Sequence, residues 1–413
     1  FKSWEPAHVD RVMNMVERNK CHPSIVIWSL GNEAGPGDVF KACTAAVKAR
    51  DLSRPVQYER NNWLTDMGSR QYPSVQWMWD CANAKEGMSH VFNDQPLRYP
   101  FHVNEYAHNM GNAMGNLKDY QDAIESTTRI CGAAIWDWVD QAIWHVTTNG
   151  TKILAYGGDF GDFPNAGAFV CNGCVLADRT VEPGYWEVKH VFQPIVAEMG
   201  ADSKSIKVTN RHYFRDLSAY DCRLTHFVNG ERISSKTFDL QAGPRETVVL
   251  PVADPTGSWR IEFIQKEDEG LWPEGWVIAD DQVDFTAPKV CTAEPSGNLK
   301  FGFDPSTGEL NSLKSGMFFK TELLKKPLTL DIYRAPSQNE PRQKKIWNEV
   351  GAMAPEKKLV SFTDCNAEGA RRVKSVVDYV IKGTVYRVET VWTIKNGAAK
   401  VKATFTQSGK RFE

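Results

Sequence analysis

Residues Ser24-Ile-Val-Ile-Trp-Ser-Leu30 form an apolar run that leads directly into Gly31-Asn-Glu33. The run is apolar on both faces, as expected of a parallel strand that is buried between helices. A glutamate at the end of such a strand is hard to explain by packing, because burying an isolated carboxylate costs free energy. The segment therefore predicts an α/β fold that presents Glu33 at the end of one strand.

Four similar but weaker runs follow within the first 195 residues, separated by helical patterns. They are Val56-Gln-Tyr58, the residues around Tyr72, Tyr99-Pro-Phe-His-Val103 and Gly132-Ala-Ala-Ile-Trp-Asp-Trp-Val139. The clearest helical pattern spans Val39 to Arg50, where Phe40, Cys43 and Val47 repeat in register. This alternation of strand and helix predicts a layered α/β protein.

Near residue 195 the apolar pattern changes to period two, with frequent turns. Strands are predicted at Ala219 to Val228, Thr247 to Val252 and Trp259 to Gln265, with a hairpin turn at Asn229-Gly230. Thr286-Ala-Pro-Lys289 is interpreted as a linker. After it, further strands are predicted at Asn298 to Phe303, Val376 to Ile381, Val385 to Trp392 and Val401 to Thr406. We therefore expect three domains, at residues 1–193, 194–286 and 287–413.

The charges nearly balance, with 49 Lys or Arg and 51 Asp or Glu. The sequence lacks the basic excess of a nucleic-acid-binding protein, and no apolar run approaches the roughly 18 to 20 residues of a membrane span. Nine cysteines are scattered without the pattern of a disulfide framework, and Cys171-x-x-Cys174 lacks the second pair of a zinc site. We expect neither a nucleic-acid nor a membrane partner.

Acidic residues follow two more of the apolar runs. Phe101-His-Val103 leads into Asn104-Glu105, and Ile135 leads into Trp136-Asp137. In an α/β barrel, side chains at the ends of the strands form the catalytic face. Two carboxylates at one such face suit glycoside hydrolysis, in which one carboxyl group is protonated and the other is ionised. Tryptophans near the strand ends support a sugar site, since an indole ring covers the apolar face of a pyranose.

Two other interpretations use the same residues. Glu105-Tyr-Ala-His108 and Glu187-Val-Lys-His190 have the spacing of di-iron helical bundles, but the first follows a strand and the helical content is too small for a bundle. A protein that binds sugar without turnover remains an alternative.

Five motifs in order resemble the large multidomain β-galactosidases of glycoside hydrolase family two. They are His22-Pro-Ser-Ile-Val-Ile-Trp-Ser-Leu-Gly-Asn-Glu33, Asn104-Glu-Tyr-Ala-His-Asn-Met-Gly-Asn112, Trp136-Asp-Trp-Val-Asp-Gln141, Tyr156-Gly-Gly-Asp-Phe-Gly-Asp162 and Asn172-Gly-Cys-Val-Leu-Ala-Asp-Arg-Thr180. Tyr333-Arg-Ala-Pro336 extends the resemblance into the third domain.

The resemblance implies a partial (β/α)8 TIM barrel, namely strands four to eight, in residues 1–193. An immunoglobulin-like β-sandwich and the start of a larger β-sandwich domain follow. It also implies that the chain is a fragment that lacks the first barrel strands and has little activity alone. A homo-oligomer is expected only of the full-length parent, and the sequence leaves cytoplasm and periplasm open as compartments.

The resemblance further implies hydrolysis of terminal non-reducing β-D-galactose from β-galactosides such as lactose, through a covalent galactosyl-enzyme. Glu33 would be the acid/base and Glu105 the nucleophile. The substrate-binding residues would be Asn32, Tyr72, His108, Trp136 and Asn172. Mg²⁺ would bind Glu33, and Na⁺ would bind Asn172 and the backbone carbonyl of Phe169. Another exo-β-glycosidase, such as a β-glucuronidase, is the alternative within the family.

Overall fold

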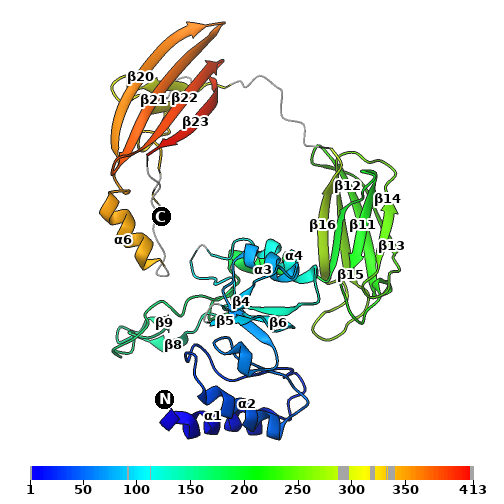
Figure 1. Ribbon diagram of the computed structural model, residues 1–413. Helices are drawn as coiled ribbons and strands as arrows, with labels where there is room; N and C mark the ends of the chain where they lie inside the picture. The colour runs from blue at the N-terminus through cyan, green and yellow to red at the C-terminus, as the bar shows by residue number, and fades with distance from the viewer. Residues whose placement is uncertain are drawn as a thin grey trace. The chain divides into compact units, whose positions relative to one another are not determined.

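The computed structural model describes residues 2–90, 93–111, 113–286, 297–316, 321–331, 333 and 340–409. Contacts divide the chain into two units, residues 1–288 and 289–413, which are coloured blue to green and yellow to red in Figure 1. Residues 287–289 of the predicted linker lie outside the described residues. Asn112 and residues 334–336 of the family motifs also lie outside them.

A parallel strand overlaps or adjoins each of the five predicted runs in the first part. Strand β1 (Trp28–Ser29) pairs with β2 (Val56–Gln57), and β6 (Phe101–Tyr106) lies between β3 (Gly68–Gln71) and β7 (Ile130–Ile135). Helices alternate with them: α1 (Glu5–Asn19), α2 (Val39–Arg50), α3 (Val75–Ala82), α4 (Leu117–Glu125) and α5 (Pro183–Val191). Short elements connect these: η1 (Lys2–Trp4), η2 (Asn62–Leu64) and the hairpins β4 (Ser89–His90) with β5 (Asn93–Pro96) and β8 (Ile143–Val146) with β9 (Lys152–Ala155).

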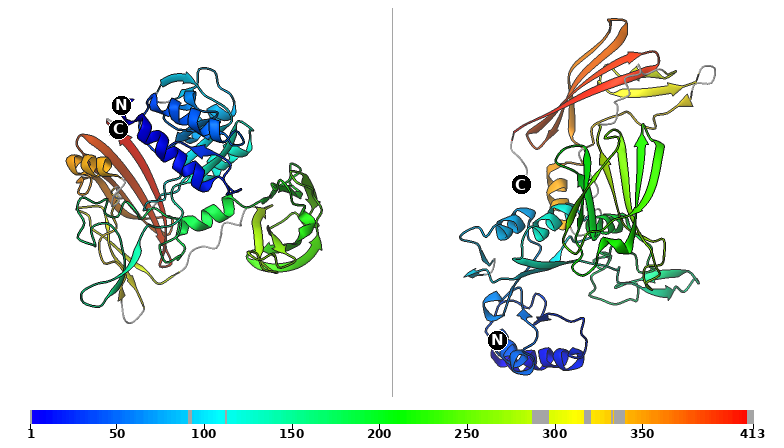
Figure 2. Two further views of the ribbon diagram at one scale, coloured as in Figure 1. Left: turned by 90° about the horizontal axis from the view of Figure 1, so that it is seen from below. Right: turned by 90° about the vertical axis from the view of Figure 1, so that its right-hand side faces the viewer.

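The predicted helix at Val39 to Arg50 is confirmed. It packs beside α1, as the views in Figures 1 and 2 agree. Phe40, Cys43 and Val47 are buried against Val12 and Val16 of α1. This packing covers the outer side of β1 and β2 and fixes the strand that leads to Glu33.

The expectation that residues 24–30 are buried on both faces is wrong. Val26 is 67% exposed, whereas Trp28 and Leu30 are buried. The backbone explains the difference. Only from Trp28 onward do amides of this segment donate to the neighbouring segment, where the Pro55 and Gln57 carbonyls accept. Strand β1 is consequently two residues long.

The second part of the first unit is a sandwich of two antiparallel sheets. One sheet has the order β10 (Ile195–Met199), β11 (Ser205–Asn210), β14 (Thr247–Pro251), and the other the order β13 (Glu231–Asp239), β12 (Tyr220–Val228), β15 (Ser258–Gln265), β16 (Val277–Asp284). The short helix η3 (Leu217–Ala219) precedes β12. The hairpin predicted at Asn229-Gly230 is confirmed, with φ of 52° and 85°, as the favoured two-residue turn requires.

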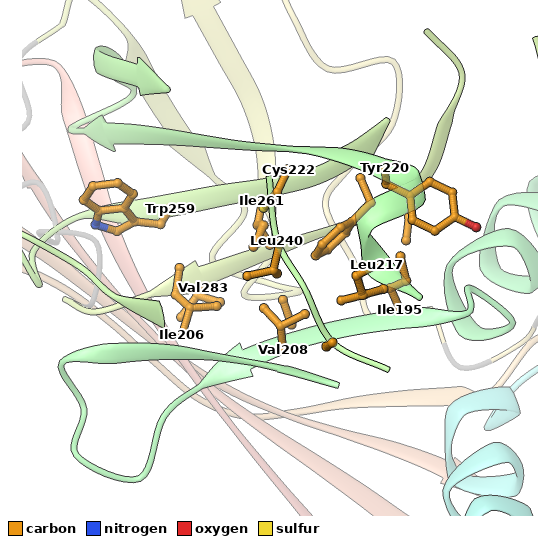
Figure 3. Packing of buried hydrophobic residues seen from close by; sticks show 14 of the residues in the cluster. Ile195, Ile206, Val208, Leu217, Tyr220, Cys222, Leu240, Trp259, Ile261 and Val283 are labelled. Atoms are coloured by element: carbon orange, nitrogen blue, oxygen red, sulfur yellow. The ribbon is translucent and has the colours of Figure 1, made fainter. Parts of the chain in front are cut away.

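The two sheets enclose one apolar core (Figure 3). Ile206 and Val208 of the first sheet and Cys222 and Ile261 of the second are fully buried in it. The pairing of the second strand with the fifth, and of the third with the sixth, is that of an immunoglobulin-like sandwich, which confirms the predicted fold.

A buried carboxylate joins the start of the sandwich to the residues after α5. Asp281 Oδ2 accepts hydrogen bonds from the Ala197 amide at 2.6 Å and from Gln193 Nε2 at 2.9 Å. Burial raises the pKa of Asp281, an effect that these two hydrogen bonds oppose.

The second unit contains two antiparallel sheets, β17 (Lys300–Phe303), β18 (Leu310–Ser315), β19 (Thr321–Glu322) and β20 (Glu356–Ala367), β21 (Ala370–Ile381), β22 (Thr384–Lys395), β23 (Ala398–Ser408). Helix α6 (Pro341–Val350) precedes the second sheet. Four predicted strands correspond to β17, β21, β22 and β23, whereas β20 was not predicted because almost all its residues are exposed. Among the described residues, no helix has the length and apolar character needed to span a membrane.

Candidate active site

Three parallel strands place polar residues at their carboxyl ends. Glu33 follows β1, Gln71 ends β3 and Glu105 lies near the end of β6. Residues Gln71 and Glu105 are partners in the β3–β6 pairing. Because parallel strands bring their carboxyl ends to one edge, these side chains share one face of the barrel part.

The side-chain amide of Gln71 connects Asn32 with Glu105. Its Nε2 donates to Glu105 Oε1 at 2.8 Å and to Asn32 Oδ1 at 3.0 Å. Glu105 is only 8% exposed, so this contact supplies a hydrogen bond to a nearly buried carboxylate. The ends of the first and fourth of the five parallel strands thus meet in a single site.

Glu33 lies at the open side of this site, with its side chain 53% exposed. Its backbone amide donates to Glu59 Oε1 at 2.8 Å, and Arg60 Nη2 lies 3.7 Å from its Oε1. Glu33 has a φ of 50°, a conformation that is uncommon for residues with a side chain. Glu59 is 2% exposed, and burial raises its pKa. The buried Glu59 therefore holds the loop that presents Glu33 to solvent.

Tyr72 lies among three carboxylates. Burial is the largest cause that raises the pKa of Tyr72. The hydrogen bond to Glu105 and the negative charges of Glu105, Glu33 and Asp137 raise it further. The hydroxyl therefore stays protonated and donates to Glu105. The Tyr72 hydroxyl is thus linked to Glu105 by a hydrogen bond and lies within electrostatic range of Glu33 and Asp137.

His108 lies beside Tyr72, and Phe169 lies beside His108. The His108 ring centroid lies 5.9 Å from that of Tyr72 and 5.8 Å from that of Phe169. Burial lowers the pKa of His108, although Glu105 and Asp137 act in the opposite direction. The imidazole is thus biased toward its neutral form, which can both donate and accept a hydrogen bond.

The segment after β7 links Trp136 to Asn172. The Trp136 amide donates to the Tyr106 carbonyl at 2.9 Å, and the Asp137 amide donates to the Asn172 carbonyl at 2.8 Å. Asn172 Nδ2 contacts the Phe169 carbonyl at 3.3 Å. These contacts place Asn172 beside the segment after β7 and beside Phe169, and they attach Trp136 to β6 through its backbone.

The donors expected for Na⁺ fit a hard cation. Asn172 Oδ1 is buried and has no hydrogen-bond partner among the described residues, and the Phe169 carbonyl oxygen is next to the same amide. Oxygen atoms of this kind suit such ions. For Mg²⁺ the described residues supply Glu33, but no group of three or more His, Cys, Asp or Glu that could hold a metal. They do not, by themselves, make a Mg²⁺ site.

The sequence interpretation gave no role to Gln71, Glu59 or Arg60. A signal for Glu59 was present, because Glu59 follows the apolar run Val56-Gln-Tyr58 as Glu33 and Glu105 follow theirs. Gln71 and Arg60 carry no comparable signal, since neither is an acidic residue that follows an apolar run.

Family models match nearly the whole chain. Residues 2–197 match "Glycosyl hydrolases family 2, TIM barrel domain", residues 206–286 match "Beta-galactosidase, domain 4", and residues 295–412 match "Beta galactosidase small chain". The chain belongs to glycosyl hydrolase family 2, with a TIM barrel domain followed by β-sandwich domains.

Two curated relatives carry the name beta-galactosidase. The protein from Photobacterium profundum is 31% identical over 94% of this chain and 42% of its own length. That from Priestia megaterium is 32% identical over 82% of this chain and 34% of its own length. The chain thus spans less than half of each relative. A solved β-D-mannosidase from Dictyoglomus thermophilum aligns over 99% of this chain and 51% of its own, with a TM-score of 0.35 and 11% identity.

Proposed function

We propose that this chain supplies the two catalytic carboxylates of a retaining β-galactosidase, which releases terminal β-D-galactose from β-galactosides such as lactose. The observation that supports this most is the Gln71 amide, which connects Asn32, next to Glu33, with Glu105. The names of the curated relatives favour galactose as the sugar.

In the first step, a carboxylate oxygen of Glu105 attacks the anomeric carbon of galactose. The glycosidic C–O bond breaks, and Glu33 donates its proton to the departing oxygen. Gln71 and Tyr72 both donate hydrogen bonds to Glu105 and so orient the attacking carboxylate. The exposed position of Glu33 suits a proton donor to an aglycone that must leave toward solvent.

In the second step, Glu33 is ionised and takes a proton from water as the water oxygen attacks the anomeric carbon. The ester bond to Glu105 breaks, its carboxylate is restored, and Glu33 regains its proton. The sugar leaves with its original anomeric configuration.

His108, Trp136, Asn172 and Asn32 would bind the galactosyl group. The neutral His108 can donate and accept hydrogen bonds with sugar hydroxyls. Na⁺, if bound by Asn172 and Phe169, would supply a positive charge to polarise a hydroxyl. We assign no step to Mg²⁺, for which the described residues offer one ligand.

The test uses the complete gene product and a nitrophenyl β-galactoside, with proton NMR of the first sugar anomer released. The β anomer first would support double displacement. Appearance of the α anomer first would contradict it. A panel with β-glucuronide and β-mannoside substrates distinguishes the other exo-glycosidases, and binding without turnover would indicate the sugar-binding alternative.

A further inference from the structure

A chain of polar contacts runs between the two proposed catalytic carboxylates. Arg60 Nη2 donates to Gln71 Oε1 at 3.3 Å and lies 3.7 Å from Glu33 Oε1. The Gln71 Nε2 at the other end of the same amide contacts Glu105 and Asn32. Gln71 therefore uses both ends of its amide within the site.

Only one orientation of the Gln71 amide satisfies all these neighbours. Its NH₂ group faces two oxygens, Glu105 Oε1 and Asn32 Oδ1, while its oxygen faces the Arg60 guanidinium. If the amide were rotated by half a turn, its oxygen would face two acceptors and its NH₂ group a cation. Since guanidinium groups only donate, Arg60 selects the orientation in which Gln71 donates to the nucleophile.

Arg60 is itself held in place. Its side chain is 19% exposed, and its Nε lies 3.5 Å from Oε1 of the buried Glu59. Glu59 and Arg60 lie in the turn shortly after β2, and Gln71 ends β3. The groups that orient the Gln71 amide thus come from the turn after β2, where the buried Glu59 and the largely buried Arg60 are held.

We propose that Gln71 is a positioning residue for the Glu105 nucleophile, with Arg60 fixing the orientation of the Gln71 amide. This inference rests on the proposed function, and it adds two residues to the proposed mechanism. A hydrogen bond from a fixed amide leaves fewer orientations to the Glu105 carboxylate and keeps Asn32 at a set position beside it.

The test is a set of variants of the complete gene product, assayed with dinitrophenyl β-galactoside, whose leaving group needs no proton. We expect Gln71→Met to lower kcat/KM by about 10- to 100-fold, the range for loss of a hydrogen bond to a charged group. Gln71→Glu is nearly isosteric but places a second carboxylate against Glu105. It should lower kcat/KM more than Gln71→Met at pH 7, and part of the loss should be recovered as the pH is lowered.

Arg60→Met should lower kcat/KM with this substrate in the wild-type background but have no further effect in Gln71→Met, because Arg60 acts through Gln71. The matched control is Gln76→Met, because Gln76 is exposed on α3 and its Nε2 donates to Asp80 Oδ1 at 2.8 Å, away from the candidate site. It should match the wild type.

Three results would each overturn the inference. The first is equal kcat/KM of Gln71→Met and wild type, and the second is equal losses in Gln71→Met and Gln71→Glu. The third is additive effects of Arg60→Met and Gln71→Met. If the wild-type gene product turns over no β-galactoside, the proposed function fails and this inference fails with it. Thermal unfolding of each variant separates lost activity from lost folding.

Discussion

The barrel part and the first sandwich differ in how many of their buried polar side-chain atoms lack a hydrogen-bond partner. In the sandwich, the core between the sheets is apolar. Among its described residues, 195–286, Gln265 Oε1 is the one buried side-chain oxygen or nitrogen without a hydrogen-bond partner. In the barrel part, Glu59, Asn61, Ser69, Asn104, Tyr106 and Asn172 each have such an atom.

The backbone shows the same difference. In the sandwich, positive φ at residues other than glycine occurs between strands, as at Ser203, Asn229 and Arg245. In the barrel part it occurs at Glu33 and Tyr72, two candidate site residues, and also at positions outside the site, as at Ala84, Met114 and Arg179. Local strain and unpartnered polar atoms are costly, and at Glu33, Tyr72 and Asn172 they coincide with the candidate site. Substitutions in the two regions should therefore change different quantities.

The largest effect is expected at Glu105. Glu105→Gln removes the attacking carboxylate and should lower kcat by at least about 10⁴-fold, with the unfolding free energy nearly unchanged. Glu198→Gln is the matched control, since Glu198 is exposed on β10 and forms an ion pair with Lys207. Activity of Glu105→Gln within tenfold of wild type would exclude a nucleophilic role.

Glu33→Gln should have an effect that depends on the leaving group. Loss of a proton donor should lower kcat/KM by about 10²- to 10⁴-fold for lactose, which has a poor leaving group. For dinitrophenyl β-galactoside the loss of kcat/KM should be much smaller. Steady-state kinetics with both substrates checks this, and equal losses would contradict an acid role for Glu33.

In the sandwich, Ile261→Ala should reduce stability without altering chemistry. Ile261 is fully buried in the core, so the cavity should lower the unfolding free energy by about 2–5 kcal/mol. Urea unfolding measures this, with the exposed Ile233→Ala as a control that should change it by less than about 0.5 kcal/mol. Activity per folded molecule should be retained, and loss of that activity would contradict the division between the regions.

The smallest effect concerns pH and Asp281. Because burial raises the pKa of Asp281 above 3.8, the folded state holds this proton more tightly than the unfolded state. Its contribution to stability is thus present at low pH and is lost as the pH rises through the folded pKa. Asp281→Asn can keep both hydrogen bonds through Oδ1 and should remove this dependence.

Urea unfolding of the wild type and Asp281→Asn at pH 4 and pH 7 checks this expectation. The unfolding free energy of the wild type, relative to that of the variant, should decrease from pH 4 to pH 7. At pH 7 the unfolding free energies of the two proteins should differ by about 1 kcal/mol or less. A relative stability that rises with pH would mean that Asp281 is stabilised as a charged group.

Regular, local patterns could be predicted from the sequence. The apolar spacing of Val39 to Arg50 gave the bounds of α2, and Asn229-Gly230 gave the hairpin, because both depend on neighbouring residues. Strand β20 could not be found in this way, since its exposed faces carry no apolar period. The length of β1 was also missed, because it depends on the positions of the Pro55 and Gln57 carbonyls that accept its hydrogen bonds.

The candidate site shows the same limit. Glu33 and Glu105 could be proposed from the strands that precede them and from the resemblance to a known family. The contact of Gln71 with both Asn32 and Glu105 could not, because it joins residues 39 and 34 positions away in the sequence. Contacts of this kind depend on which distant strand ends come together, because parallel strands are joined by long crossover connections.

The most direct measurement is covalent trapping of the nucleophile. The complete gene product is treated with dinitrophenyl 2-deoxy-2-fluoro-β-galactoside, digested, and mapped by mass spectrometry. We predict a single fluorogalactosyl ester on Glu105, formed together with loss of activity. An ester on any other residue, or undiminished activity without labelling in a protein that hydrolyses β-galactosides, would contradict the assignment of Glu105.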